Sequence, residues 1–158
     1  WAFSGFTALK SVSMPSSVTA IGNGAFNRCT ALQSVSIPSS VTAIGTNPFI
    51  GCHNLQINLS YNNHFRIIDN LLISDSGNLI SCLNTASRIS IPSSVTAIGN
   101  KAFYNCEALQ SVSIPSSVTA IGGYAFYECT ALQSINIPSS VTAIGDEAFP
   151  FNCHINKV

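Results

Sequence analysis

The sequence predicts a repeat solenoid built mainly of short β-strands, and two recurring patterns carry this prediction. The pentad Pro-Ser-Ser-Val-Thr begins at five positions: Pro15, Pro38, Pro92, Pro115 and Pro138. Three of the four steps between these prolines are 23 residues long, and the step from 38 to 92 equals one period of 23 and one of 31. The dipeptide Ala-Phe recurs in the same register, beginning at Ala2, Ala25, Ala102, Ala125 and Ala148. A fixed period of this size indicates a solenoid and outweighs local signals of secondary structure.

The Ala-Phe register divides the chain, residues 1–158, into one solenoid domain. The predicted repeats are 2–24, 25–47, 48–70, 71–101, 102–124 and 125–147, followed by a partial repeat, 148–158. Pro48-Phe49 and Leu71-Leu72 replace the dipeptide in the third and fourth repeats. The first residue falls inside a repeat, so we expect the chain to be a segment of a longer protein.

Each repeat is predicted to hold two short strands and one helical turn. In the second repeat, Leu32–Ile37 ends in strict alternation of apolar and polar residues, which is typical of a strand with one buried face. Pro38 cannot donate a backbone hydrogen bond and should end this strand. Val41–Gly45 is a second short extended segment, and residues 25–29 have the spacing of a single helical turn.

Stacking of the repeats should align their apolar positions into ladders that are buried only between neighbouring repeats. Three columns are expected: Val12, Val35, Ile57, Ile89, Val112 and Ile135; Met14, Ile37, Leu59, Ile91, Ile114 and Ile137; and Phe3, Phe26, Phe49, Phe103, Phe126 and Phe149. We expect each column to form one ladder along a stack roughly 30 Å long.

The fourth repeat departs from the others because it is longer and lacks the Ala-Phe turn. Two apolar runs within residues 71–83 flank Asp75-Ser76-Gly77, a sequence typical of a turn between antiparallel strands. We predict a β-hairpin here in place of the helical turn.

The repeat unit reads Ala-Phe-x-x-Cys-x-x-Leu-x-x-Val-x-Ile-Pro-x-x-Val-x-x-Ile-Gly. It resembles the BspA-like class of leucine-rich repeats over nearly the whole chain, including the irregular fourth copy. The resemblance implies a leucine-rich-repeat-like solenoid on a cell surface or in a secreted protein. It also implies adhesion to host or matrix proteins, or contact between cells, and it brings no catalytic residues.

Five of the six cysteines lie in or near one column, and the sixth, Cys82, lies in the predicted hairpin. The column comprises Cys29, Cys52, Cys106, Cys129 and Cys153. Disulfide bonds between adjacent repeats, a metal site, or buried free thiols could each explain this column. We favour free thiols, because the first repeat has Phe6 at this position. The pairs Cys52-His53 and Cys153-His154 lie four repeats apart, roughly 19 Å, which is too far to share a metal ion.

Charged residues make up only 8% of the chain, and six basic residues balance six acidic ones. This balance argues against nucleic acid as a partner, and against electrostatic attachment to a membrane. No apolar run is long enough to span a bilayer, so we expect no membrane insertion. The chain has no phosphate-cradling motif, nucleophile elbow or paired-histidine helix, so we expect no enzymatic activity, metal or cofactor.

Three surfaces are candidates for binding a partner. The candidate residues are Gln56, Asn58 and Arg88 on the outward strand face, Tyr104, Tyr124 and Tyr127 on the turn side, and His64 and Arg66 beside the hairpin. The alternatives are a solvated polar face, loose packing of the tyrosines, and a structural role for the segment around Phe65. Asn58-Leu59-Ser60 is also the one N-glycosylation sequon.

We therefore expect a non-catalytic, protein-binding or adhesive segment of a larger cell-surface leucine-rich repeat protein. Its partner would be a host protein, a matrix protein or another copy of itself. The nearly identical repeats suit an alternative, a structural spacer or self-assembling fibre. A threonine ladder beginning at Thr19 and Thr42 raises a third idea, ice binding, but the third repeat interrupts that ladder.

Overall fold

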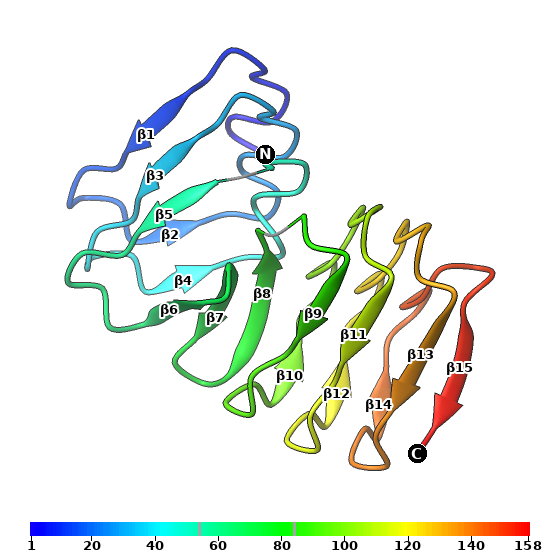
Figure 1. The fold of residues 1–158 in the computed structure, drawn as a ribbon. Helices are drawn as coiled ribbons and strands as arrows, with labels where there is room; N and C mark the ends of the chain where they lie inside the picture. Colours follow the sequence, from blue (N-terminus) through cyan, green and yellow to red (C-terminus); the bar gives the residue numbers. More distant parts are fainter. Residues whose placement is uncertain (54, 84) are drawn as a thin grey trace.

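The computed structural model describes residues 1–53, 55–83 and 85–158, and it shows short strands joined by turns (Figure 1). The strands on one side of the coil are β1 (Ser11–Ser13), β3 (Ser34–Ser36), β5 (Gln56–Asn58), β9 (Arg88–Ser90), β11 (Ser111–Ser113), β13 (Ser134–Ile137) and β15 (His154–Lys157). Those on the second side are β2 (Ala20–Ile21), β4 (Ala43–Ile44), β10 (Ala97–Ile98), β12 (Ala120–Ile121) and β14 (Ala143–Ile144). The irregular centre contributes β6 (Phe65–Ile68), β7 (Leu71–Ser74) and β8 (Asn78–Cys82).

Parallel pairing of equivalent strands confirms the predicted solenoid and its register. On the first side, Val12 lies opposite Val35 and Val35 lies opposite Ile57. On the second side, Ile98 lies opposite Ile121. Along β3, β9, β11 and β13 the inward residues Val35, Ile89, Val112 and Ile135 are buried between less buried neighbours, as the alternation predicts.

The corner that follows each first-side strand explains the repeated Pro-Ser-Ser-Val-Thr pentad. The second serine of the pentad donates a hydrogen bond to the valine carbonyl of the preceding turn. These bonds join Ser40 Oγ to Val18 O at 2.7 Å, Ser117 Oγ to Val95 O at 2.7 Å and Ser140 Oγ to Val118 O at 2.8 Å. The serine therefore links one coil to the previous one, and this bond forms only where equivalent corners stack on each other.

The prediction of one helical turn per repeat is wrong, because residues 25–29 form a non-helical turn. Backbone amides there alternate between two kinds of partner. Cys29 N bonds within the turn to Phe26 O at 3.1 Å, whereas Phe26 N crosses to Pro48 O in the next coil at 2.8 Å. Arg28 has a φ of 59°, which a right-handed helix does not allow. None of the described segments is a helix capable of crossing a lipid bilayer.

Two positions in the turn adopt a left-handed backbone conformation in repeat after repeat. The first column, directly before the Ala-Phe position, comprises Gly24, Lys101, Tyr124 and Glu147. The second column, two residues after the phenylalanine, comprises Gly5, Arg28, Gly51, Asn105 and Glu128. We call these two columns the left-handed positions. The non-glycine residues at these positions are exposed or half-buried, so the apolar core does not dictate their side chains.

The predicted hairpin at 71–83 is confirmed, since β7 and β8 pair in antiparallel fashion. Gly77 closes its turn with a φ of 85°, and a side chain there would meet Ser94 O at 2.8 Å. A second hairpin, which the sequence analysis missed, joins β6 to β7. Its turn residues Asp69 and Asn70 have φ values of 49° and 60°, as a tight type I′ turn requires.

The hairpin strand β7 separates the interior into two apolar cores. Leu71 and Ile73 face the core of the C-terminal half, whereas Leu72 between them faces the core of the N-terminal half. All three side chains are completely buried. A strand buried on both faces explains the continuous apolar run Leu-Leu-Ile.

The expectation that each apolar column forms one ladder is wrong at the centre of the molecule. In the described residues, β5 is the last strand of the sheet β1-β3-β5, and β9 pairs only with β11. The rings of Phe26 and Phe49 stack on each other, but Phe103 does not extend this stack. The physical reason is that β6, β7 and β8 all join the second-side sheet, while the first side gains no strand between β5 and β9. The two half-stacks therefore lie at an angle (Figure 1). We call the junction between residues 46–52 and 101–106 the elbow.

A buried asparagine bridges the elbow where the backbone ladder breaks. The amide of Asn47 donates to Lys101 O at 2.6 Å, and its oxygen accepts from Ser81 Oγ at 2.6 Å. The same oxygen accepts from Phe49 N at 3.3 Å, whereas Phe26 N and Phe103 N bond to the backbone of the next coil. Asn47 is 2% exposed and Ser81 is fully buried. The Asn47 side chain thus makes hydrogen bonds that the backbone of an adjacent regular coil makes elsewhere in the stack.

The proline that follows Asn47 explains its unusual conformation. Equivalent residues such as Lys101 and Tyr124 have a positive φ, but Asn47 does not. They precede alanine, whereas Asn47 precedes Pro48. Proline disfavours helical conformations in the residue before it. Asn47 therefore does not adopt the left-handed conformation of the equivalent residues, and its side chain lies in the elbow.

Replacing Asn47 by alanine should destabilise the protein by about 2–3 kcal/mol, because buried groups of Phe49, Ser81 and Lys101 lose their partner. Urea denaturation followed by circular dichroism measures this loss. Asn100→Ala is the matched control, since its side chain accepts one exposed bond, from Gly123 N at 2.8 Å, and should cost about 0.5–1 kcal/mol. Equal losses in the two variants would contradict the bridging role of Asn47.

Candidate binding surfaces

Three tyrosines form a cluster on the turn side of the C-terminal half. The rings of Tyr104 and Tyr127 stack with centroids 5.7 Å apart, and Tyr124 meets Tyr127 edge-on at 5.4 Å. Tyr104 and Tyr127 hold equivalent positions in successive repeats, so the coil spacing itself sets the stack. All three side chains are partly exposed. We call these residues, together with Lys101, the tyrosine cluster.

Lys101 lies between two rings of the tyrosine cluster. Its Nζ is 5.7 Å from the centroid of Tyr104 and 5.7 Å from that of Tyr124. These distances fall within the range of cation–π attraction. Lys101 and Tyr124 both hold left-handed positions one period apart, so the backbone fixes their spacing. The cluster thus presents aromatic faces and a positive charge together.

Nearby carboxylates raise the pKa values of two of these tyrosines. Burial, followed by the charge of Glu128, raises the pKa of Tyr104, while the positive charge of Arg28 opposes this shift. The charge of Glu147, whose Oε1 lies 3.3 Å from the hydroxyl, raises the pKa of Tyr124. The hydroxyls of Tyr104 and Tyr124 therefore stay protonated at neutral pH and can donate hydrogen bonds.

The tyrosine cluster lies beside a cleft of about 310 Å³ at the elbow. Residues of both halves line it, including Asn27, Arg28 and Ile50 on one wall and Lys101, Tyr104, Asn105 and Glu128 on the other. With its amide nitrogen facing the carboxylates, Asn105 donates to Glu128 and Glu107 at 3.2 Å each. The cleft therefore combines an aromatic ring, amides and charges of both signs.

The outward strand face carries Gln56, Asn58 and Arg88 as predicted, but it does not bring all three together. All three side chains are exposed. Gln56 and Asn58 belong to β5, whereas Arg88 belongs to β9 beyond the break in the sheet. The Asn58 side chain accepts from Ser60 N at 3.0 Å and Ser60 Oγ at 2.5 Å within the sequon. The rest of this face is mainly serine, which offers few anchoring groups.

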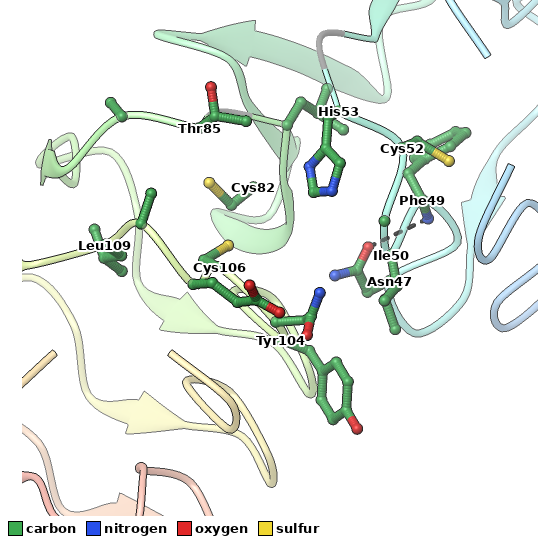
Figure 2. Close-up of a pocket in the computed structure, with 16 residues that line it drawn as sticks. Asn47, Phe49, Ile50, Cys52, His53, Cys82, Thr85, Tyr104, Cys106 and Leu109 are labelled. Carbon is green, nitrogen blue, oxygen red and sulfur yellow. Dashed lines mark hydrogen bonds between the residues drawn. The ribbon is translucent and has the colours of Figure 1, made fainter. Parts of the chain in front are cut away.

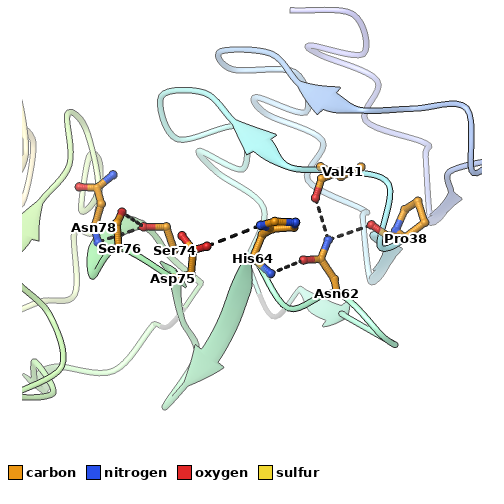
Figure 3. Close-up of polar contacts among 8 residues, drawn as sticks. All are labelled: Pro38, Val41, Asn62, His64, Ser74, Asp75, Ser76 and Asn78. Atoms are coloured by element: carbon orange, nitrogen blue, oxygen red, sulfur yellow. Dashed lines mark hydrogen bonds and ion pairs between the residues drawn. The ribbon is translucent and has the colours of Figure 1, made fainter.

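His64 and Arg66 lie beside the hairpin, and Figure 3 shows the contacts of His64. His64 Nδ1 lies 3.5 Å from Asp75 Oδ2, and its backbone carbonyl accepts from Asp75 N at 2.8 Å. The buried Asn62 amide anchors the same segment by donating to Pro38 O and Val41 O. Arg66 lies in β6, where its Nε is buried and unpaired in the described part of the chain. His64 thus holds the hairpin tip in place.

The six cysteines are present as thiols in the structure, and three of them are buried. Cys29, Cys52 and Cys129 are at most 3% exposed, whereas Cys82, Cys106 and Cys153 are partly exposed. Cys82 and Cys106 line a second cavity at the elbow, with His53 on the opposite wall (Figure 2). In residues 1–53, 55–83 and 85–158, no three metal-binding side chains gather around one point.

The sequence analysis found the tyrosines but missed the groups around them. The repeat register alone places Lys101 one period before Tyr124, so this neighbour could have been found. Arg28 and Glu128, in contrast, meet in one cleft only because the elbow brings the two halves together. No pattern within one repeat signals that contact.

Comparisons with known proteins agree with the repeat pattern. The chain matches the family described as BspA type leucine-rich repeat region, six copies, over residues 1–87 and 78–158. No match was found among curated proteins.

Solved structures of bacterial proteins share this fold. A leucine-rich repeat protein from Eubacterium ventriosum is 32% identical, with a TM-score of 0.76, over 87% of this chain and 38% of its own. A leucine-rich cell surface protein from Faecalibacterium prausnitzii is 34% identical, with a TM-score of 0.73, over 91% of this chain and 45% of its own. The pneumococcal vaccine antigen PcpA, at 19% identity and a TM-score of 0.64, shares the fold alone. The chain spans less than half of the first two proteins.

Replacing Glu147 by glutamine should lower the pKa of Tyr124 toward its ordinary value, because the carboxylate that disfavours the phenolate is removed. Tyrosinate absorbance would then appear at lower pH in an ultraviolet titration. Asp75→Asn is the control, since Asp75 lies in the hairpin and its loss should leave the titration unchanged. A titration curve of the Glu147 variant that matches the wild type would rule out this electrostatic coupling.

Proposed function

Since the chain belongs to the family of BspA-type leucine-rich repeat proteins, we propose that it is a protein-binding segment of a larger, extracellular or cell-surface protein. Leucine-rich repeat folds are typically non-catalytic and present surface to partners. The similar protein from Faecalibacterium prausnitzii is described as a leucine-rich cell surface protein. Its 34% identity over most of this chain supports the same location here.

The partner contact that we propose is the tyrosine cluster with the adjoining cleft at the elbow. Tyrosine and arginine are enriched among the residues that dominate binding energy, and concave sites allow these residues to be buried. Tyr104 belongs to both features, since it stacks on Tyr127 and lines the cleft. Arg28 and Glu128 give the cleft charges of both signs. This exposed aromatic cluster beside a cleft is the observation that carries the proposal.

Protein is the partner class that this chemistry fits best. The cleft joins an aromatic surface to charges of both signs, since Arg28, Lys101 and Glu128 all line it, rather than to a purely basic patch. Such a mixture suits a folded protein surface with its own charged and apolar side chains. Host proteins, matrix proteins and a second copy of this chain all belong to this class. Gln56, Asn58, Arg88, His64 and Arg66 would then be secondary contacts at most.

The test uses immobilised fibronectin, fibrinogen, laminin and collagen, with binding measured by surface plasmon resonance. We expect at least one of these proteins to bind, and simultaneous replacement of Tyr104, Tyr124 and Tyr127 by serine to weaken that binding by about tenfold or more. The matched control replaces Ser34, Ser111 and Ser134 on the outward strand face by alanine. Circular dichroism checks that both variants keep their fold.

Unchanged binding by a folded tyrosine variant would overturn the tyrosine cluster as the contact site. A loss of binding in the serine-to-alanine control alone would move the site to the outward strand face. Failure of the wild-type chain to bind any of the four proteins would count against adhesion to matrix.

A self-assembling structural element is the second candidate, favoured by the nearly identical repeats. A regular stack of this kind presents the same groups at each coil, which suits a spacer or a fibre.

Light scattering over a range of concentrations distinguishes the two candidates. If the partner is a host or matrix protein, we expect a constant monomer mass of 16.6 kDa. A mass that grows with concentration would instead favour assembly.

A further inference from the structure

The second cavity at the elbow contains two cysteines that the proposed function does not use. It has a volume of about 240 Å³, and Cys82 and Cys106 both line it. Figure 2 shows both sulfur atoms on the same wall of this cavity. Both residues are half-buried, and the cavity that they line is open to small molecules in solution.

The thiols of the cysteine column normally contact a phenylalanine of the preceding coil. Cys29 Sγ donates to Phe3 O at 2.9 Å, Cys52 Sγ to Phe26 O at 3.0 Å and Cys129 Sγ to Phe103 O at 3.1 Å. Each cysteine therefore lies against the residue in the phenylalanine position of the coil before it. This contact follows from the repeat itself and not from any one coil.

In the coil that contains the hairpin, the phenylalanine position is held by Cys82. Its backbone N donates to Ala102 O at 2.8 Å, just as Phe103 N donates to Ala125 O at 2.7 Å. The next cysteine of the column is Cys106, so the repeat geometry brings Cys106 against another cysteine. Hydrogen bonds with the thiols of Cys129 and Cys82, followed by burial, raise the pKa of the Cys106 thiol. Besides Cys129, Cys106 thus has a second thiol neighbour, Cys82, on the side where other coils have phenylalanine.

We propose that Cys82 and Cys106 form a redox-sensitive dithiol, which a small-molecule disulfide converts into an intramolecular disulfide bond. The two thiols are in hydrogen-bond contact and line the same cavity (Figure 2), and a disulfide bond requires such an approach. Cys129 is the other neighbour of Cys106, but it is completely buried and its thiol is engaged with Phe103 O. The bond therefore forms toward the cavity.

The reaction is two successive thiol–disulfide exchanges. One cysteine thiolate attacks a sulfur of the oxidant, which forms a mixed disulfide and releases one small-molecule thiol. The second cysteine thiolate then attacks the mixed disulfide, which forms the Cys82–Cys106 bond and releases the second thiol. Two cysteine protons pass to the two released thiolates, and the oxidant is reduced by two electrons. Because the pKa of Cys106 is raised, we expect the reaction to accelerate as the pH rises.

The test incubates the reduced chain with glutathione disulfide at neutral pH and at about pH 9. We expect loss of two of the six thiols and a mass lower by two hydrogen atoms. Trypsin cuts after Arg88 and Lys101, and glutamyl endopeptidase cuts after Glu107, so unreduced digestion isolates a peptide pair joined through Cys82 and Cys106. We also expect the melting temperature to rise by about 5 °C, because the bond restricts the unfolded chain.

Cys82→Ala and Cys106→Ala should each abolish the joined peptide pair, and Cys153→Ala is the matched control that should retain it. Three results would overturn the proposal: no loss of thiols at either pH, mixed disulfides with glutathione only, or a bond from Cys106 to Cys129. Peptide mapping of the wild-type chain decides among these results without any variant.

Discussion

The structure depends on backbone hydrogen bonds that cross from each coil to the next. In every regular turn, alternate amides bond to the neighbouring coil, so no coil satisfies its own backbone. This constraint excludes a helix at the turn, because a helix would use the same amides internally. It also explains the left-handed positions, which rotate successive peptide groups between the two directions. Where the hairpin interrupts the succession of coils, a side chain must replace the lost partner, and Asn47 does so.

The regular parts of this fold could be predicted because each is encoded within one period. Alternation marked the strands, proline marked their ends, and Asp75-Ser76-Gly77 marked the hairpin. The turn was mistaken for a helix because spacing alone does not reveal that amides cross between coils. The elbow could not be predicted, since Asn47 and Ser81 are separated by 34 residues and neither is unusual by itself. The tyrosines were found because the repeat pattern does not call for tyrosine at their positions. The cleft beside them was not found, because residues of both halves of the stack line it.

The hairpin has effects beyond its own residues. It adds strands to one side of the coil, which bends the stack and places the turns of the two halves against each other. The hairpin also places Cys82 at the position where other coils have phenylalanine. A single irregular repeat therefore creates the cleft, the bridging asparagine and the adjacent thiols, while the regular repeats supply the rigid frame that holds them.

The left-handed positions also involve a trade-off between backbone strain and surface chemistry. Glycine adopts this conformation without strain and does so at Gly24 and Gly51, whereas a side chain there costs about 1 kcal/mol. Gly24 and Gly51 line the same cleft as Arg28, Lys101 and Glu128. At the last three positions the cleft therefore gains its charged groups at a cost in backbone strain, which the two glycines avoid.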